Sequence, residues 1–317
     1  MVLAPMADVT DCAFRQIIAK YGAPDVFWTE FVSADGLAHP IAREKLLIDL
    51  KYGENEHPIV AQIFGSKAEN IKSASALCKE LGFDGIDINM GCPDKSIEKQ
   101  CSGAGMIKNP ELAKAVIEAA KEGAPGLPIS VKTRIGYNKN EIDTWIRFLL
   151  EQDIAVLTVH LRTRKEMSNV PAHWELMQRI VELRNEISPT TLIFGNGDVL
   201  SIEDGKKKCV ETGCDGAMLG RAIFGNPWLF TGKIPTTEEK LKVLIEHTKL
   251  FEEMLGAHKN FAIMKKHYKA YTKGIDARPT EGRQSFGRGA KELRVELMEA
   301  ENAEQVEKIV NAFLGKI

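Results

Sequence analysis

The sequence predicts an α/β protein whose core is a (β/α)8 TIM barrel, followed by a small C-terminal all-helical domain. Three observations support this fold class. Short β-prone runs alternate with amphipathic helical stretches, there are eight such runs, and polar residues or glycines follow nearly every one of them. Beyond about residue 236 only helical patterns remain. We therefore divide the chain into a barrel domain, residues 1–235, and a helical domain, residues 236–317.

The eight predicted strands are mostly continuous apolar runs rather than alternating ones. This pattern is typical of parallel strands that are buried on both faces. They cover residues 2–6, 26–32, 58–64, 85–90, 128–133, 156–161, 191–195 and 216–219. A doubly wound nucleotide-binding sheet is less favoured, because the first turn reads Ala-Pro-Met-Ala-Asp and lacks a G-x-G-x-x-G motif.

Amphipathic segments predict helices between the strands and after the barrel. Between the strands they cover residues 67–81, 110–121, 141–152 and 201–212. The last of these begins with Ser201, a favourable cap, and has Glu203 and Asp204 in its first turn, where the helix dipole favours acids. The C-terminal helices cover residues 238–256, 258–273, 289–299 and 303–314.

Composition places the chain among globular proteins with a large core. Hydrophobic residues make up 44% of the 317 residues and charged residues 27%. The N-terminus lacks the pattern of a signal peptide, and no apolar run approaches the ~20 residues of a membrane span. The six cysteines form no C-x-x-C pair. We therefore expect a cytoplasmic protein with free thiols, no metal and no membrane contact.

A cysteine follows the fourth predicted strand, in the segment Asn89-Met90-Gly91-Cys92-Pro93. Strand ends and the loops after them are where a barrel displays catalytic groups. By position alone, a cysteine before a proline is more often structural than catalytic. Cys92 is therefore a candidate that needs further context.

Two glycine-containing loops follow the seventh and eighth predicted strands. They read Gly-Asn-Gly-Asp at residues 195–198 and Gly-Arg-Ala at residues 220–222. In this architecture these two loops commonly bind phosphate, because glycines let backbone N–H groups approach an anion. Arg221 adds a cation. The loops alone predict a phosphate group, which a flavin or a phosphorylated substrate would equally supply.

Together these segments resemble the successive signatures of the tRNA-dihydrouridine synthase family. The matching segments, in the family's order, are residues 4–11, 89–93, 132–136, 160–164 and 195–198 with 220–222. Each is weak alone, whereas the ordered set spans the whole barrel and is specific. The resemblance implies an oxidoreductase acting on CH–CH bonds, in which NADPH reduces a bound FMN. The FMN then delivers hydride to C6 of a uridine in tRNA while Cys92 protonates C5.

The resemblance also implies a set of cofactor-binding residues. They are Pro5, Met6, Gln62, Lys132, His160, Asn196, Gly197, Asp198, Gly220 and Arg221. The matching lysine contacts the flavin ring, where a cation tunes the cofactor, and the matching histidine lies on the phosphate side. Simpler interpretations stay open: a lysine that reaches solvent, a packed core histidine, and a core amide at Gln62 whose hydrogen bonds are satisfied.

Substrate contacts implied by the resemblance come from both domains. Asn89 would hydrogen-bond the uracil edge, and Arg134 and Arg162 would line the same rim, while Lys265 and His267 belong to a helix that resembles the family's tRNA-contacting helix. The chain departs from the family pattern where Ser168 replaces a tyrosine, Val170 a glycine and Cys101 a glycine. These departures affect the predicted substrate contacts and the shape of the loop after Cys92.

A local basic segment contrasts with the formal net charge of −2. Residues 259–294 hold ten basic residues against three acidic ones, a net charge of +7. With His267, Tyr268 and Tyr271 interleaved, the segment suits backbone contacts and stacking on RNA. The alternative is an ordinary solvated helix face.

Two other functions compete with tRNA-uridine reduction. One is an FMN-dependent barrel oxidoreductase acting on a small pyrimidine or related molecule, which would share the phosphate loops without needing the basic helical domain. The other is an RNA-binding protein on an inactive barrel scaffold. Retention of Cys92 and Lys132 speaks against the inactive scaffold.

Overall fold

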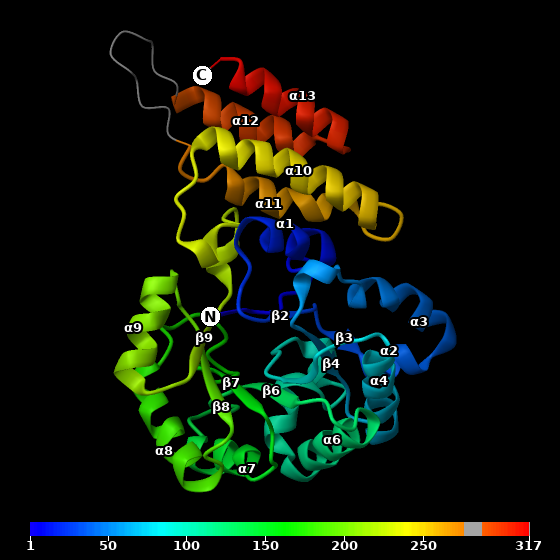
Figure 1. The fold of residues 1–317 in the computed structure, drawn as a ribbon, viewed down its shortest axis with the longest axis vertical. Coiled ribbons are helices and arrows are strands. Elements are labelled where there is room, and N and C mark those ends of the chain that lie inside the picture. Colours follow the sequence, from blue (N-terminus) through cyan, green and yellow to red (C-terminus); the bar gives the residue numbers. More distant parts are fainter. Residues whose placement is uncertain (276–286, 317) are drawn as a thin grey trace.

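Short parallel strands form the wall of a barrel, and helices surround it (Figure 1). The structure is a computed structural model that describes residues 1–275 and 287–316. Within these ranges the strands lie in the order β1-β9-β8-β7-β6-β5-β4-β2, and β3 pairs with β4. Their bounds are β1 Val2–Leu3, β2 Phe27–Trp28, β3 Val32–Ser33, β4 Ile59–Phe64, β5 Gly85–Met90, β6 Ile129–Arg134, β7 Val156–His160, β8 Leu192–Asn196 and β9 Gly216–Leu219.

The first strand of the chain pairs with the last, which nearly closes the barrel. Val2 lies opposite Met218 and Leu3 opposite Leu219 in a parallel register. On the other side of β1, the N–H of Asp25 donates to the carbonyl of Met1 at 3.1 Å, just before β2. The predicted (β/α)8 barrel is confirmed.

Two predicted strands are shorter or more broken than their apolar runs indicate. The run at residues 2–6 yields only β1, because Pro5 has no N–H to donate to a neighbouring strand. The run at residues 26–32 is split into β2 and β3, which both pair with β4. Between them the side chain of Glu30 turns toward Lys259, which lies beyond the barrel.

Helices α4 Ala68–Glu80, α6 Pro110–Gly123 and α9 Ile202–Thr212 confirm three predicted helices. Ser201 caps α9 as expected, since its Oγ accepts from the N–H of Asp204 at 3.1 Å. The predicted helix at residues 141–152 begins as a π-helical segment, Ile142–Ile146, and continues as α7, Arg147–Leu150. Helices not singled out from the sequence are α1 Cys12–Gly22, α2 Ala34–Ala38, α3 Pro40–Leu46, α5 Lys95–Glu98 and α8 Met177–Ile187.

Among the described residues, four helices follow the barrel and stack above α1 (Figure 1). They are α10 Thr237–Leu255, α11 Met264–Tyr271, α12 Gly287–Glu299 and α13 Ala303–Leu314. Thr236 and Glu239 form a capping box that starts α10. The division into two domains at residues 235 and 236 stays a prediction. In the described parts of the chain, no helix is both long enough and apolar enough to cross a membrane.

The helical region contacts the barrel through a buried aromatic cluster and a buried ion pair. Phe14 on α1 stacks on His247 of α10, with ring centroids 4.7 Å apart, and meets the edge of His267 on α11 at 4.8 Å. The Nζ of Lys259, between α10 and α11, lies 2.8 Å from a carboxylate oxygen of Glu30 and 2.8 Å from one of Asp49. The helices are thereby held directly over the barrel.

Candidate active site

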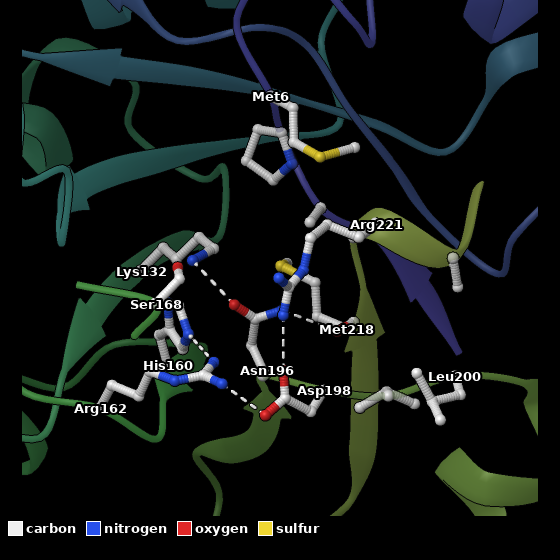
Figure 2. Close-up of a pocket in the computed structure, with 16 residues that line it drawn as sticks. Met6, Lys132, His160, Arg162, Ser168, Asn196, Asp198, Leu200, Met218 and Arg221 are labelled. Carbon is white, nitrogen blue, oxygen red and sulfur yellow. Dashed lines mark hydrogen bonds and ion pairs between the residues drawn. The ribbon is translucent and has the colours of Figure 1, made fainter. Parts of the chain in front are cut away.

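A cavity of about 330 Å³ opens at the carboxyl ends of the barrel strands (Figure 2). Side chains from β6, β7, β8 and β9 line it, together with the turn after β1. Nine of the ten predicted cofactor-binding residues lie there: Pro5, Met6, Lys132, His160, Asn196, Gly197, Asp198, Gly220 and Arg221. Segments from the two ends of the barrel sequence therefore meet at one site.

The loop after β8 has a backbone that only glycine fits at its centre. Gly197 has a φ of +119°, and an added Cβ would lie 2.8 Å from the Cβ of Ala172 and 3.1 Å from a ring carbon of His160. Asp198 follows with a φ of +51°, also in the left-handed region. These conformations bring the backbone of the loop to the edge of the cavity.

Asp198 is held between two arginines at the cavity edge (Figure 2). Arg162 donates to one carboxylate oxygen, and Nη2 of Arg221 lies 2.6 Å from the other. The hydrogen bond from Arg162 holds the pKa of Asp198 below its ordinary value. The Arg162 side chain is 3% exposed and that of Arg221 is 67% exposed. Arg221 is therefore the cation free to reorient toward an anion, whereas Arg162 is fixed.

Lys132 ends its side chain inside the cavity, with Nζ 3.3 Å from Oδ1 of Asn196. Burial, followed by the charge of Arg134, lowers the pKa of Lys132 to about 8. At neutral pH the ammonium is thus still mostly protonated. Burial, followed by the charge of Lys132, lowers the pKa of His160 well below its ordinary value, so this ring is neutral. The cavity thus holds the partly buried ammonium of Lys132 beside a neutral imidazole.

Cys92 follows β5 and is half-buried. It is not among the residues that line the cavity, but it lies near enough to Lys132 for their charges to interact. Burial is the main cause that raises the pKa of its thiol. A thiol in this state is protonated at neutral pH and can donate its proton. The loop after Cys92 packs closely on it, since a Cβ at Gly103 would lie 2.7 Å from the Cys92 carbonyl oxygen. Cys101 is exposed and has a φ of +55°, so it takes a glycine-like conformation with its thiol directed to solvent.

Arg134 is buried rather than displayed on an open rim. Its Nε donates to the carbonyl of Gly91 at 2.7 Å, and its Nη1 donates to the carbonyls of Thr163 at 3.2 Å and Met167 at 2.9 Å. Burial lowers the pKa of Arg134 to about 10. The side chain ties the Cys92 loop to the loop after β7, and its place in substrate contact stays a prediction.

Gln62 and Asn89 lie within the barrel wall, where they are hydrogen-bonded to each other. Nδ2 of Asn89 donates to Oε1 of Gln62 at 3.0 Å, and Nε2 of Gln62 donates to Asp87 at 2.6 Å. The side chain of Gln62 is thus a core amide with hydrogen bonds to Asp87 and Asn89. Its contact with the cofactor stays a prediction. Asp87 was missed as a site residue. The signal for it was an acid two positions before Asn89 in an apolar strand, which puts both on one strand face.

The prediction that His267 contacts RNA is wrong, because its side chain is fully buried between α11 and the barrel. Tyr268 and Tyr271 are likewise buried, so the predicted stacking on RNA fails for all three rings. Lys259 is also engaged, in its ion pair with Glu30. Lys265 is partly exposed, and so remains a candidate contact.

Other parts of the predicted basic segment remain at the surface or lie beyond description. Lys266 is partly exposed and Lys269 is exposed. Arg278 and Arg283 lie outside the described residues, as does the side chain of Arg288. Within residues 1–275 and 287–316, no cluster of histidine, cysteine or acidic side chains has the arrangement needed to hold a metal ion.

The chain is similar in sequence to proteins described as dihydrouridine synthases. The family model described as dihydrouridine synthase matches residues 2–313. A probable tRNA-dihydrouridine synthase of Staphylococcus aureus is 41% identical over 317 residues, covering 98% of this chain and 92% of that protein. Probable tRNA-dihydrouridine synthase 2 of Bacillus subtilis is 41% identical over 319 residues, covering 99% of this chain and 94% of that protein.

Solved structures with the same fold are far more distant in sequence. The old yellow enzyme homologue from Zymomonas mobilis has a TM-score of 0.54 and 15% identity, covering 74% of this chain and 89% of that one. Morphinone reductase in complex with tetrahydroNAD has a TM-score of 0.51 and 13% identity, covering 72% and 84%. At such identities the likeness shows the fold alone, whereas the family match and the 41% identical relatives show that this chain belongs to the dihydrouridine synthase family.

Proposed function

We propose that the chain reduces a uridine in tRNA to 5,6-dihydrouridine, using FMN held in the cavity at the barrel mouth and NADPH as the reductant. As a dihydrouridine synthase it is an oxidoreductase acting on a CH–CH bond. The observation that carries the proposal is the pairing of the Lys132 ammonium, on β6 inside the cavity, with the thiol of Cys92, which follows the neighbouring strand β5. That pairing suits addition of hydride and a proton across a double bond.

The cavity fits an FMN in both its anionic and its apolar parts. Gly197 and Gly220 bring backbone to the cavity edge, and Arg221 can turn from Asp198 to a phosphate. Met6, Pro5 and Met218 provide an apolar surface for a flat ring, and Lys132 supplies a cation beside it. When bound, the flavin would supply hydride to C6 of the uracil ring.

The chain's own residues would complete the reaction. After hydride reaches C6, C5 needs one proton, which the Cys92 thiol donates, and the resulting thiolate recovers a proton from solvent. Asn89 has one Nδ2 hydrogen bonded to Gln62, and its second is available for a carbonyl oxygen of the base. Overall, one NADPH and one proton are consumed for each dihydrouridine formed.

The helical region would hold the rest of the tRNA, through Lys265, Lys266 and the exposed Lys269 on α11. A base stacked inside folded RNA must leave its stack to enter the cavity, which costs a few kcal/mol that contacts elsewhere must offset. With the aromatic side chains of α11 buried, these contacts would be to phosphates rather than to bases. We propose the cytoplasm as the site of this activity.

Nucleoside mass spectrometry tests the proposal directly. Purified protein would be incubated with unmodified tRNA and NADPH, and the digested nucleosides compared with a reaction lacking NADPH. We expect dihydrouridine only in the complete reaction, and FMN absorbance and fluorescence in the supernatant of heat-treated protein. Reduction of free uracil or uridine, with tRNA left unchanged, would instead establish the small-pyrimidine oxidoreductase. Binding of tRNA without any flavin would establish the inactive scaffold.

A further inference from the structure

A row of buried polar side chains crosses three neighbouring strands of the barrel wall. Gln62 on β4, Asp87 on β5 and Ser130 on β6 are register neighbours, with Gln62 opposite Asp87 and Asp87 opposite Ser130. Each is at most 5% exposed. Such groups are costly to bury unless every one of them is hydrogen-bonded. Their bonds therefore have to form one consistent pattern.

These side chains form a continuous chain of hydrogen bonds that ends at the backbone of Cys92. The hydroxyl of Ser130 donates to Oδ1 of Asp87 at 2.5 Å, and Nε2 of Gln62 donates to Oδ2 at 2.6 Å. Nδ2 of Asn89 then donates to Oε1 of Gln62 at 3.0 Å. Finally, Oδ1 of Asn89 accepts from the backbone N–H groups of Gly91 at 3.1 Å and Cys92 at 2.9 Å.

The groups at the two ends of this chain require the same direction, and both contribute to it. Backbone N–H groups only donate, so the atom of Asn89 that meets them must be its oxygen, and its NH2 must face Gln62. The facing atom of Gln62 is then its oxygen, which leaves its NH2 for Asp87. A carboxylate only accepts, so Asp87 requires the same orientation from the opposite end. Burial raises the pKa of Asp87 to about 6, against the opposing hydrogen bonds from Ser130 and Gln62, so this carboxyl group is mostly ionised at neutral pH.

We propose that Asp87 is a positioning residue that acts through Gln62 to fix the amide orientation of Asn89. In that orientation the Asn89 oxygen holds the backbone at Cys92, and its remaining N–H is available to a carbonyl acceptor of the substrate. Reversal of the amide would put an NH2 against the N–H groups of Gly91 and Cys92 and offer the substrate an oxygen instead. The inference rests on the proposed function for its catalytic meaning, but the orientation itself belongs to the protein alone.

Asp87 has a second effect that a test must separate from this one. Its negative charge lies close enough to Lys132 to oppose the loss of that lysine's proton. Asp87→Asn removes the charge but keeps an acceptor, because its Oδ1 can take the bond from Gln62 while its Nδ2 donates to the Ser130 hydroxyl. Asp87→Leu removes both charge and acceptor. If Asp87 acts by orienting the amides, Asp87→Asn should resemble wild type. If it acts through its charge, Asp87→Asn should resemble Asp87→Leu.

The variants would be compared in uridine reduction and in reduction of the bound flavin by NADPH. We expect Asp87→Leu to lower kcat/KM for tRNA by about tenfold or more, as for a site polar group left wrongly paired. Flavin reduction should change equally in Asp87→Leu and Asp87→Asn, because both variants lack the charge near Lys132. Asp87→Asn should recover most of the loss, and Ser130→Ala, which leaves the bond between Asp87 and Gln62 in place, should stay close to wild type. An Asn variant as impaired as the Leu variant would overturn the orientation role in favour of charge.

A readout without turnover makes the test independent of the proposed function. In cofactor-free protein labelled with 15N, the backbone amide resonances of Gly91 and Cys92 should shift in Asp87→Leu and stay near their wild-type positions in Asp87→Asn. Should Asp87→Leu fail to fold, Gln62→Met breaks the same chain one step later and should shift the same two resonances. Unchanged resonances in whichever of these two variants folds would overturn the inference. Shifted resonances in a protein that makes no dihydrouridine would leave it standing and remove only the proposed function.

Discussion

The ammonium group of Lys259 is paired with the carboxylate of Glu30 across the junction of barrel and helical region, with side chains only 12% and 6% exposed. The other oxygen of Glu30 accepts from the N–H of Asp8 at 2.5 Å. Asp8 lies within the turn after Pro5 and Met6, which the N–H groups of Val9 and Thr10 close by donating to the carbonyl of Met6. The helical region is therefore connected through one ion pair to the loop that borders the proposed cofactor site.

Lys259→Met should destabilise the protein strongly. Removing one partner leaves the Glu30 carboxylate buried without its main cation, a loss of about 3–5 kcal/mol for pairs of this kind. Lys20→Met is the matched control. Lys20 also links the barrel to α10, through Glu246, but its side chain is 58% exposed, and such pairs contribute about 0–1 kcal/mol. Denaturant unfolding measures both, and equal losses would contradict the assignment of the Lys259 pair as the energetic link.

Cys92→Ala should slow uridine reduction by about 100-fold or more, because a positioned general acid is lost. Reduction of the flavin by NADPH should be unchanged, since no proton from the thiol enters that step. Single-turnover rates of the two half-reactions provide the measurement. The control is Cys101→Ala, whose exposed thiol should be dispensable. If Cys101→Ala showed the large loss and Cys92→Ala did not, the proton donor would be misassigned.

Lys265→Ala with Lys266→Ala should weaken tRNA binding and reduce its dependence on salt. Each lost phosphate contact lowers the slope of log affinity against log salt by roughly one unit or less. Flavin content and NADPH oxidation should not change. A titration across salt concentrations measures the slope, with Lys249→Ala and Lys308→Ala on α10 and α13 as a control of equal charge. Equal slopes in both double variants would assign tRNA binding to another surface.

Lowering the pH should weaken the contact between helical region and barrel through His267. Burial lowers the pKa of His267 to about 3, so below about pH 6.5 the unfolded chain binds a proton that the folded chain does not. Stability is therefore lost as pH falls from 6.5 toward 3, by at most about 1.4 kcal/mol per pH unit for this group. The free energy of unfolding of His267→Phe should exceed that of wild type, and the difference should increase as the pH falls. Unfolding midpoints at pH 7, 6 and 5 test this, and a constant margin would contradict it.

The barrel could be predicted from the sequence because its strands are buried on both faces and therefore read as apolar runs. The phosphate loops could also be predicted, since the glycines that follow β8 and β9 are a local signal. The break between β2 and β3 could not, because it accompanies an ion pair between Glu30 and Lys259, 229 residues apart. Sequence spacing contains no information about such a partner.

His267 shows how a local pattern misled the prediction of the RNA surface. The lysines around it indicated an exposed basic helix. However, Met264, His267, Tyr268 and Tyr271 follow the i, i+3, i+4, i+7 spacing of a buried stripe, and all four are buried. Lys265, Lys266 and Lys269 fall off that stripe. The apolar periodicity of this helix therefore indicates the buried position of His267 more directly than the neighbouring charges do.

The pairing of β1 with β9 has a consequence for how the protein is made. Val2 and Leu3 leave the ribosome before the other strands of the barrel, yet their partners Met218 and Leu219 are translated only after all of those strands. Until then the growing chain carries an open strand edge, the kind of surface that pairs with other chains. The loop of Pro5 and Met6 cannot meet Gly220 and Arg221 before that moment. A nascent chain stalled before β9 would therefore have no complete cofactor cavity and would depend on chaperones for its solubility.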